Sequence, residues 1–444
     1  MNQDQLRRKH ADVQQQYEEL REKIAELQQA YAVATENTER ATLKQQIAAA
    51  EVAHVQMAQE LATIEQQLHP DDAPPGITAP AGGDTDTDIE VETLIELQQG
   101  GEPIFPPEPA EDSMRPNSPF YIERPGDRTV ITTIRKPGQG ATITIKGPPQ
   151  VGKSALLDRA VAAAREAGKR VALINLQEFS AVAHTDADTF LRQFCRRMTA
   201  AAGLDGSADR LDAAWNEPLD VTRRCTHYLQ QYLPIGLTQP LVLALDEVES
   251  LRTRPFCGDF LGMLRRWHTC RATDERWRQF DLLLVTSIEP DQLVTDRSQS
   301  PFDVSTVIEL SDFTPDQVSL LNRRHGMPFT SGEEQQLIAL LNGHPYLTRR
   351  ALYLVAAREL RMTPADIFVD ATSEEGPFGA HLRAQLQRLR EHPDLVAHMR
   401  QVLENQTCAE QSCLRLRGIG LVRRAGKAVL PRCQLYANYL RERL

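Results

Sequence analysis

Long apolar runs are missing from this 444-residue sequence, and its seven cysteines are scattered. No stretch reaches the roughly 20 apolar residues that a membrane-spanning helix requires, and the polar, charged N-terminus is unlike a secretory signal. The cysteines form no C-x-x-C pair, and no histidine lies at zinc-ligand spacing from them. These absences argue against a membrane, secreted or zinc-finger protein. We therefore expect a cytoplasmic protein with reduced, buried thiols.

Glycine and proline are absent from residues 1–69, where apolar residues recur with heptad spacing in two runs. The first run is Leu6, Val13, Leu20 and Leu27 with Tyr17, Ile24 and Tyr31; the second is Leu43, Ile47, Ala50, His54, Met57, Leu61, Ile64 and Leu68. This spacing predicts an α-helical coiled coil over residues 1–69, and a solvated charged helix is the alternative. The runs are out of phase near residues 32–42, which fits either a hairpin or one long helix with a register slip. Because so narrow a seam cannot bury itself, we expect a homo-oligomer or docking onto the rest of the chain.

The net charge of −11 belongs to one segment. Residues 71–118 contain twelve acidic residues and one arginine, so this segment sums to −11 and the remainder of the chain sums to zero. Its Pro, Gly, Asp, Thr and Glu content predicts a disordered acidic linker over residues 70–118. The overall acidity therefore says little about the partners of the folded part.

Beyond the linker, short apolar runs alternate with helical patterns. The runs are residues 141–145, 171–176, 241–245 and 282–285, and two of the helical stretches are residues 154–167 and 189–202. This alternation predicts an α/β fold with a parallel sheet covered on both faces. From about residue 314 the pattern is almost wholly helical, with a small strand signal near residues 421–430.

A phosphate-binding loop stands between the first predicted strand and the following helix. It consists of Gly147, Pro148, Pro149, Gln150, Val151, Gly152, Lys153 and Ser154, with Ala155 continuing into the helix. The glycines let backbone N–H groups wrap a phosphate, and the helix N-terminus adds partial positive charge. Lys153 can reach the β- and γ-phosphates, and the Ser154 hydroxyl can bind Mg²⁺. The motif predicts a purine nucleoside triphosphate as ligand, with ATP and Mg²⁺ the expected pair.

A second acidic motif fits the same chemistry. The apolar run 241–245 leads into Asp246 and Glu247, at the strand end where parallel sheets hold their ligands. Asp246 is expected to hold Mg²⁺ and Glu247 to orient or deprotonate the attacking water. The alternative is an acidic cap on a following helix.

Two further features after these strands are open to more than one interpretation. A hydroxyl at Thr286 or Ser287 could sense the γ-phosphate, or it could simply end a strand. An arginine after Asp246 could act in trans on a neighbouring subunit, although most such arginines are solvated. The candidates are Arg252, Arg254, Arg265 and Arg266.

With these residues in place, the chain from about residue 118 to 444 resembles a bacterial AAA-like domain family within the STAND class of signalling ATPases. The ordered landmarks are residues 118–125, 147–154, 246–247, 300–304, 313–318, 324–326, 343–347, 416–423 and 436–441. The resemblance implies a P-loop ATPase core over residues 119–312, a helical lid over 313–376 and a winged-helix domain over 377–444. It also implies that Tyr121 and Arg124 line the adenine side and that Pro345, in a Gly-x-Pro element, contacts the base. His344 has no visible partner in the sequence, so no chemistry is assigned to it.

STAND proteins generally carry a long repeat array that senses a trigger, and no repeat period is visible here. The expectation is that a separate sensor or effector protein, or the N-terminal helices, takes that role. The favoured hypothesis is an ATP-dependent molecular switch with slow hydrolysis, which controls assembly or signalling through those helices.

The alternative is a DNA-associated AAA+ ATPase of the initiator or transposition-regulator type. Its winged helix would bind DNA through basic residues, namely Arg415, Arg417, Arg423, Arg424 and Lys427. Against this, winged helices of STAND proteins usually serve as packing modules. A P-loop kinase is a third option, which the Asp246-Glu247 pair and the predicted lid disfavour.

Overall fold

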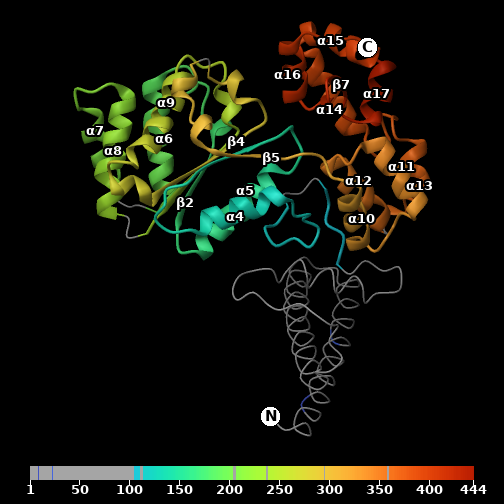
Figure 1. Cartoon of the computed structure of the whole chain (residues 1–444), viewed down its shortest axis with the longest axis horizontal. Coiled ribbons are helices and arrows are strands. Elements are labelled where there is room, and N and C mark those ends of the chain that lie inside the picture. Colours follow the sequence, from blue (N-terminus) through green and yellow to red (C-terminus); the bar gives the residue numbers. More distant parts are fainter. Residues whose placement is uncertain are drawn as a thin grey trace, which may run out of the picture. The chain divides into compact units, whose positions relative to one another are not determined.

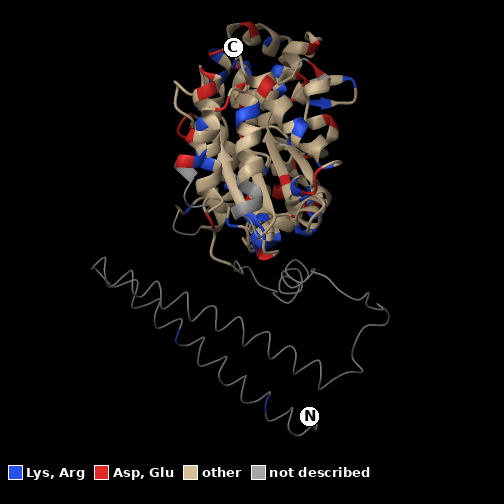
Figure 2. Cartoon of the chain, turned by 90° about the vertical axis from the view of Figure 1, so that its left-hand side faces the viewer, with Lys and Arg blue, Asp and Glu red and all other residues tan. Residues whose placement is uncertain are grey.

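The computed structural model describes residues 105–110, 114–203, 207–236, 239–294, 296–357 and 360–444, together with Lys9 and Lys23. Apart from those two lysines, the described residues belong to one unit, Asp86–Leu444 (Figure 1). The predicted coiled coil over residues 1–69 and most of the predicted linker lie outside the described residues. In Figure 2, basic and acidic residues are interspersed along the described ribbon, as its balanced charge leads one to expect.

A parallel sheet forms the centre of the described unit. Its strands are β1 (Thr142–Lys146), β2 (Arg170–Asn175), β3 (Leu241–Asp246), β4 (Phe280–Thr286) and β5 (Thr306–Glu309). Every neighbouring pair runs parallel, in the order β2-β3-β4-β1-β5. The predicted α/β fold with a parallel sheet is therefore confirmed.

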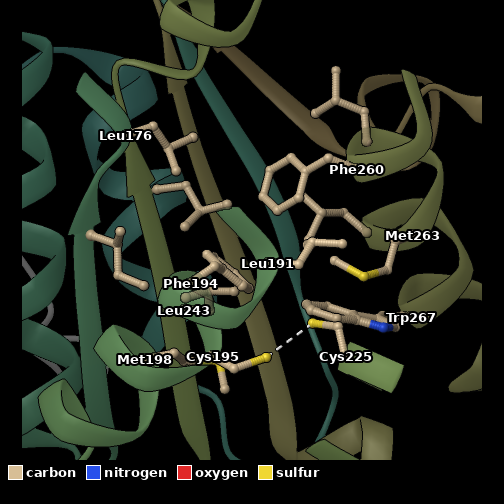
Figure 3. Packing of buried hydrophobic residues seen from close by; sticks show 14 of the residues in the cluster. Leu176, Leu191, Phe194, Cys195, Met198, Cys225, Leu243, Phe260, Met263 and Trp267 are labelled. Carbon is tan, nitrogen blue, oxygen red and sulfur yellow. Dashed lines mark hydrogen bonds between the residues drawn. The ribbon is translucent and has the colours of Figure 1, made fainter. Parts of the chain in front are cut away.

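Helices cover both faces of this sheet because its central strands are apolar on both sides. The helices of the core are α4 (Pro125–Arg135), α5 (Lys153–Glu166), α6 (Ala187–Ala201), α7 (Ser207–Trp215), α8 (Val221–Gly236) and α9 (Cys257–Cys270). On β3, Val242 and Ala244 face α4 and α5, whereas Leu243 and Leu245 face α6, α8 and α9. Figure 3 shows the hydrophobic cluster on the side of α6, α8 and α9, in which the Cys195 thiol lies 3.2 Å from the Cys225 sulfur.

Two helical groups follow the sheet. The first group contains α10 (Pro315–Arg324), α11 (Ser331–Leu341), α12 (Pro345–Ala356) and α13 (Pro364–Val369). The C-terminal group contains α14 (Gly379–Arg390), α15 (Pro393–Leu403), α16 (Glu410–Gly418), β6 (Val422–Ala425), β7 (Ala428–Pro431) and α17 (Gln434–Arg441). Strands β6 and β7 form an antiparallel pair, so the expected small strand signal in a helical region is confirmed. None of the helices in the described ranges is long and apolar enough to cross a membrane.

The last residues of the predicted linker are packed against the first helical group. The ring of Phe105 meets that of Phe120 edge to face, and Arg349 on α12 reaches the Glu108 carboxylate at 3.4 Å and the Pro109 carbonyl at 3.1 Å. The Pro116 carbonyl accepts a hydrogen bond from Arg159 on α5. The structure therefore differs from the predicted disordered linker (residues 70–118) at the end of that segment, where apolar side chains and backbone carbonyls contact the folded part.

The cysteines do not all match the expectation of free thiols. Cys408, just before α16, and Cys413, within α16, form a disulfide with Cα atoms 6.3 Å apart. That distance suits a disulfide, and a spacing of five residues is not one of the recognised sequence motifs. The other five cysteines are free, and four of them are buried. The prediction of reduced, buried thiols is wrong for Cys408 and Cys413.

A buried ion pair joins four segments of the core. The Lys169 ammonium lies 2.7 Å from Asp281 on β4 and donates to the carbonyl of Lys136, after α4. The second oxygen of Asp281 accepts the N–H of Ala141, just before β1. Only 1% and 4% of the two side chains is exposed, so each charge depends on the other for compensation.

We predict that Asp281→Ala lowers the free energy of unfolding by about 3 to 5 kcal/mol, because it leaves the Lys169 ammonium buried without a counter-ion. Urea titration followed by the fluorescence of the buried Trp267 and Trp277 measures the change. The control is Asp212→Ala, which breaks the exposed pair with Arg192 and should cost less than about 1 kcal/mol. Equal losses in the two variants would contradict the prediction.

Candidate functional site

The phosphate loop runs from the end of β1 to the start of α5 and is held in a tight turn. Gly147 packs so closely that a Cβ there would lie 2.8 Å from the Leu310 carbonyl oxygen and 2.9 Å from a methyl group of Val151. Gly152 caps α5 with φ of +101°, a left-handed conformation that suits glycine. Gln150 also has a positive φ, +62°, which is costly for a residue with a side chain. The loop's shape is therefore maintained by its surroundings.

Lys153 begins α5 and is almost fully enclosed. Its ammonium donates to the Ser287 hydroxyl at 2.8 Å, just after β4, and to the Pro148 carbonyl at 3.3 Å. Burial lowers the pKa of Lys153, although Glu249, Glu247 and Asp246 oppose that shift. Parallel pairing aligns Lys146 with Thr286 and so brings the loop and Ser287 together.

Three carboxylates face this lysine from the end of β3. Asp246 ends the strand and accepts the backbone N–H of Glu247 at 2.9 Å, and Glu247 has a left-handed φ of +55°. Glu249 accepts the backbone N–H of Ser287 at 2.9 Å, which ties β3 to β4. Burial, Glu249 and Asp246 together raise the pKa of Glu247 to about 7. Sequence reasoning missed Glu249, although three acids within four residues were a usable signal.

The predicted base-side residues lie next to the loop, but their polar groups are already engaged. The Tyr121 hydroxyl donates to Asp127 at 2.7 Å, and the Asp127 carboxylate also caps α4 by accepting the N–H of Arg124. The guanidinium of Arg124 donates to the Val151 carbonyl at 2.8 Å and lies 4.9 Å from the centre of the Phe313 ring. Arg124 therefore holds the phosphate loop itself.

The Gly-His-Pro element forms the start of α12. Gly343 has φ of +68°, and a Cβ there would lie 2.0 Å from the Phe313 carbonyl oxygen, so this close approach requires glycine. His344 caps α12 by accepting the N–H of Leu347, and its other ring nitrogen lies 3.2 Å from the Tyr436 hydroxyl. His344 thus has partners that were not visible in the sequence, and burial is the main cause that lowers its pKa.

Arg432 is a contributor that sequence reasoning missed entirely. It lies between β7 and α17, pairs with Asp312 at 2.6 Å and donates to the Pro149 carbonyl at 2.8 Å. Burial opposes its charged form, but Asp312 more than offsets this and raises the pKa of Arg432. No sequence motif links positions so far apart, so only the fold shows this contact.

A cleft of about 860 Å³ brings most of the predicted residues together. The predicted residues that line it are Tyr121, Arg124, Pro149, Gln150, Val151, Gly152, Lys153, Ser154, Ala155, Glu247 and Pro345. Gly147, Pro148 and Asp246 do not line it; the first two shape the loop and Asp246 ends β3 beside it. Residues from the C-terminal group, among them Arg388 and Ile419, complete the wall. Of the arginines considered for action in trans, Arg252 lines this cleft in its own chain, and Arg265 donates to the Ser300 carbonyl.

The end of β3 offers carboxylate oxygens to a bound cation. Asp246, Glu247 and Glu249 lie near the Lys153 ammonium there, and burial, followed by the two neighbouring carboxylates, raises the pKa of Glu247. The cleft as a whole is not acidic, because Arg124, Arg252, Arg349, Arg388 and Arg415 also line it. No group of three potential protein ligands forms a ready metal site among the described residues. Mg²⁺ needs only one or two protein ligands when phosphate oxygens supply others, so Ser154 and Asp246 fit that role.

Comparisons with known proteins agree with this architecture. A family model described as an AAA-like domain matches residues 109–442. An uncharacterized WD repeat-containing protein of Synechocystis sp. is 24% identical over 252 residues, which are 55% of this chain. The chain spans only 20% of the length of that relative.

Two solved structures from Thermotoga maritima are distantly similar. Domain III of the replication initiation protein DnaA has 16% identity and a TM-score of 0.33, over 55% of this chain and 88% of that one. The RuvB Holliday junction branch migration motor has 12% identity and a TM-score of 0.35, over 72% and 95% of the two chains.

We predict that Glu247→Gln gains stability relative to wild type as the pH rises from about 4.5 to 7.5. In that window the folded wild type still holds a proton that the unfolded chain, with a pKa of 4.5, has released, so wild-type stability falls with rising pH. The variant lacks this titration. Across this window its free energy of unfolding should rise relative to wild type by about 1 to 2 kcal/mol, a figure already reduced because Glu247 is partly exposed to water. Urea titrations at several pH values measure this difference.

Asp274→Asn is the matched control. Hydrogen bonds from Arg276 hold the pKa of the Asp274 carboxyl low, so the stability lost in this variant should stay constant between pH 5 and 8. If the stability difference between Glu247→Gln and wild type is likewise independent of pH over that range, the raised pKa of Glu247 is refuted.

Proposed function

Since the chain belongs to the AAA-like domain family, we propose that it binds ATP with Mg²⁺ in this cleft and hydrolyses it slowly, as a STAND-class molecular switch. The observation that carries the proposal is the composition of the cleft. Segments that follow the strands of the sheet, the first helical group and the C-terminal group all line one cavity that includes the phosphate loop. A nucleotide held there would contact all three parts. Whether it carries two or three phosphates could therefore favour one arrangement of the three parts over another.

The phosphate end of the cleft supplies the chemistry of hydrolysis. The loop N–H groups and the Lys153 ammonium would hold the β- and γ-phosphates. Bound Mg²⁺ would neutralise charge on the phosphate oxygens, with Ser154 and Asp246 as its protein ligands. A Glu247 carboxylate with a pKa of about 7 is suited to accept a proton from the water that attacks the γ-phosphorus.

The cleft also has apolar lining that suits a flat ring. Ile122, Phe313, Pro345 and Tyr346 bring apolar surface from three segments, and Tyr121 lines the cleft as well. The Arg124 guanidinium contributes indirectly by holding the loop. We therefore keep Tyr121 and Pro345 as base-side residues and assign Arg124 to the loop.

The domain boundaries of the switch follow the expected division into core (119–312), lid (313–376) and winged helix (377–444). In this proposal the N-terminal helices assemble subunits or recruit an effector across the acidic linker. A partial match to a WD repeat-containing protein supports the STAND class, in which a repeat array senses the trigger. Here that sensor would be a separate protein or the N-terminal helices.

The DNA-binding alternative has less support because three of its five basic residues form ion pairs within the chain. Arg415 pairs with Asp394 and Arg424 pairs with Glu410, both on the C-terminal group. Arg417 bridges Glu289 and Glu309 at the end of the sheet. Phosphate contacts to DNA would have to replace these pairs, and absence of salt-dependent DNA binding by the full chain would remove this alternative.

We predict that wild type and Glu247→Gln bind ATP in the presence of Mg²⁺, whereas Lys153→Ala loses at least about tenfold in affinity, as measured by titration calorimetry. Phosphate release should fall by about a hundredfold or more in Glu247→Gln, because the proton acceptor is gone. Wild type that binds no nucleotide would refute the ATPase proposal.

The switch itself is tested by size exclusion with light scattering. Wild type and Glu247→Gln are compared with ADP and with a slowly hydrolysed ATP analogue. A change in mass confined to the ATP form is expected if nucleotide state controls assembly, and an unchanged mass in all forms would refute that part of the proposal.

A further inference from the structure

Arg432 connects the C-terminal group to the phosphate loop through one buried guanidinium. Only 1% of the residue is exposed. Its Nε and Nη2 atoms donate to the Asp312 carboxylate, and Nη1 donates to the Pro149 carbonyl at 2.8 Å. The approach is close on the same side, because a Cβ on Gly420 would lie 3.2 Å from the Pro149 ring and 3.3 Å from that nitrogen.

Holding the Pro149 carbonyl fixes the direction of the next amide. In a trans peptide the C=O and N–H bonds point in opposite directions, so the Gln150 N–H is turned away from Arg432. Arg124 does the same two residues later, because its bond to the Val151 carbonyl turns the Gly152 N–H away from Arg124. Both amides belong to the phosphate loop, and loop N–H groups that point toward one side form a concave anion site.

The loop requires such external support. Gln150 has a left-handed φ of +62° without being a glycine, a conformation that costs roughly a kcal/mol or more and persists only where the surroundings impose it. The peptide between Pro149 and Gln150 is the one that Arg432 holds. The hydrogen bond from Arg432 and the strained backbone of Gln150 therefore involve the same peptide unit.

We propose that Arg432 is a positioning residue of the nucleotide site: from the C-terminal group, it holds the Pro149–Gln150 peptide in the orientation that binds phosphate. This inference rests on the proposed function, and it makes the phosphate site incomplete without the C-terminal group. Asp312 neutralises the guanidinium, so the effect is on the shape of the loop and not on its net charge.

The double variant Arg432→Gln/Asp312→Asn tests this without leaving a buried charge unpaired. We expect its affinity for ADP with Mg²⁺, measured by titration calorimetry on the full chain, to be about tenfold to a hundredfold weaker than that of wild type.

Arg417→Gln is the control for a general loosening of the C-terminal group. Arg417 joins α16 to Glu289 and Glu309 at the end of the sheet, but it makes no contact with the phosphate loop. It should therefore leave ADP affinity within about threefold of wild type even where it lowers the melting temperature. Equal losses of affinity in Arg417→Gln and the double variant would overturn the inference.

Hydrogen exchange of the loop amides, without nucleotide, gives a second readout. Exchange at residues 147–154 should be faster in the double variant than in wild type or Arg417→Gln, because the Gln150 peptide is released. Unchanged exchange in the double variant would overturn the inference. If wild type binds no ADP, the proposed function fails, and this exchange measurement alone decides whether Arg432 holds the loop.

Discussion

The parallel alignment of the strands is the constraint on which the cleft depends. Residue pairing places Lys146, Thr286 and Glu309 side by side at the ends of β1, β4 and β5, while Asp246 ends β3 next to β4. The segments that follow these strands therefore meet at one edge of the sheet, although they are far apart in the sequence. Both the Lys153–Ser287 contact and the Glu249–Ser287 contact depend on β4 lying between β3 and β1.

The partly buried carboxylates at the end of β3 come at the expense of stability. Burial first, and repulsion from Glu249 and Asp246 second, raise the pKa of Glu247 to about 7. A core selected for stability alone would not keep this arrangement, since proteins concentrate such perturbed groups at functional sites. The cluster therefore adds to the loop motif in supporting the proposed hydrolysis.

Features encoded by neighbouring residues could be predicted from the sequence. The four apolar strands, the phosphate loop and the acidic strand end are of this kind, because each is a local pattern. Strand β5 (Thr306–Glu309) was missed because it lies at the sheet edge and only Ile308 is buried, so it has no apolar run. The bond from Arg432 to Pro149 was missed because tertiary contacts between distant residues leave no periodic signal.

Arg124 illustrates an intermediate case, in which the resemblance pointed to the residue but the sequence did not indicate the contacts of its side chain. It lies at the cleft, as the resemblance implied, yet its guanidinium holds the Val151 carbonyl and packs on Phe313. A guanidinium has five N–H donors and can bond to any carbonyls that lie near it in the fold. The sequence alone does not show which carbonyls these are.

The side chains that hold the backbone around the cleft are arginines, which do not change charge near neutral pH, unlike Glu247 in the carboxylate cluster. Arg124, Arg349 and Arg432 bind backbone carbonyls, and an arginine keeps its charge across the physiological range even when buried. The buried histidines next to them do not titrate near neutrality either, since burial, before other causes, lowers the pKa of His381 to about 3 and that of His325 to about 4. The loop anchors therefore keep their charge at a pH where Glu247 changes its own. A protein built in this way can change the protonation of Glu247, the proposed proton acceptor, without releasing the phosphate loop.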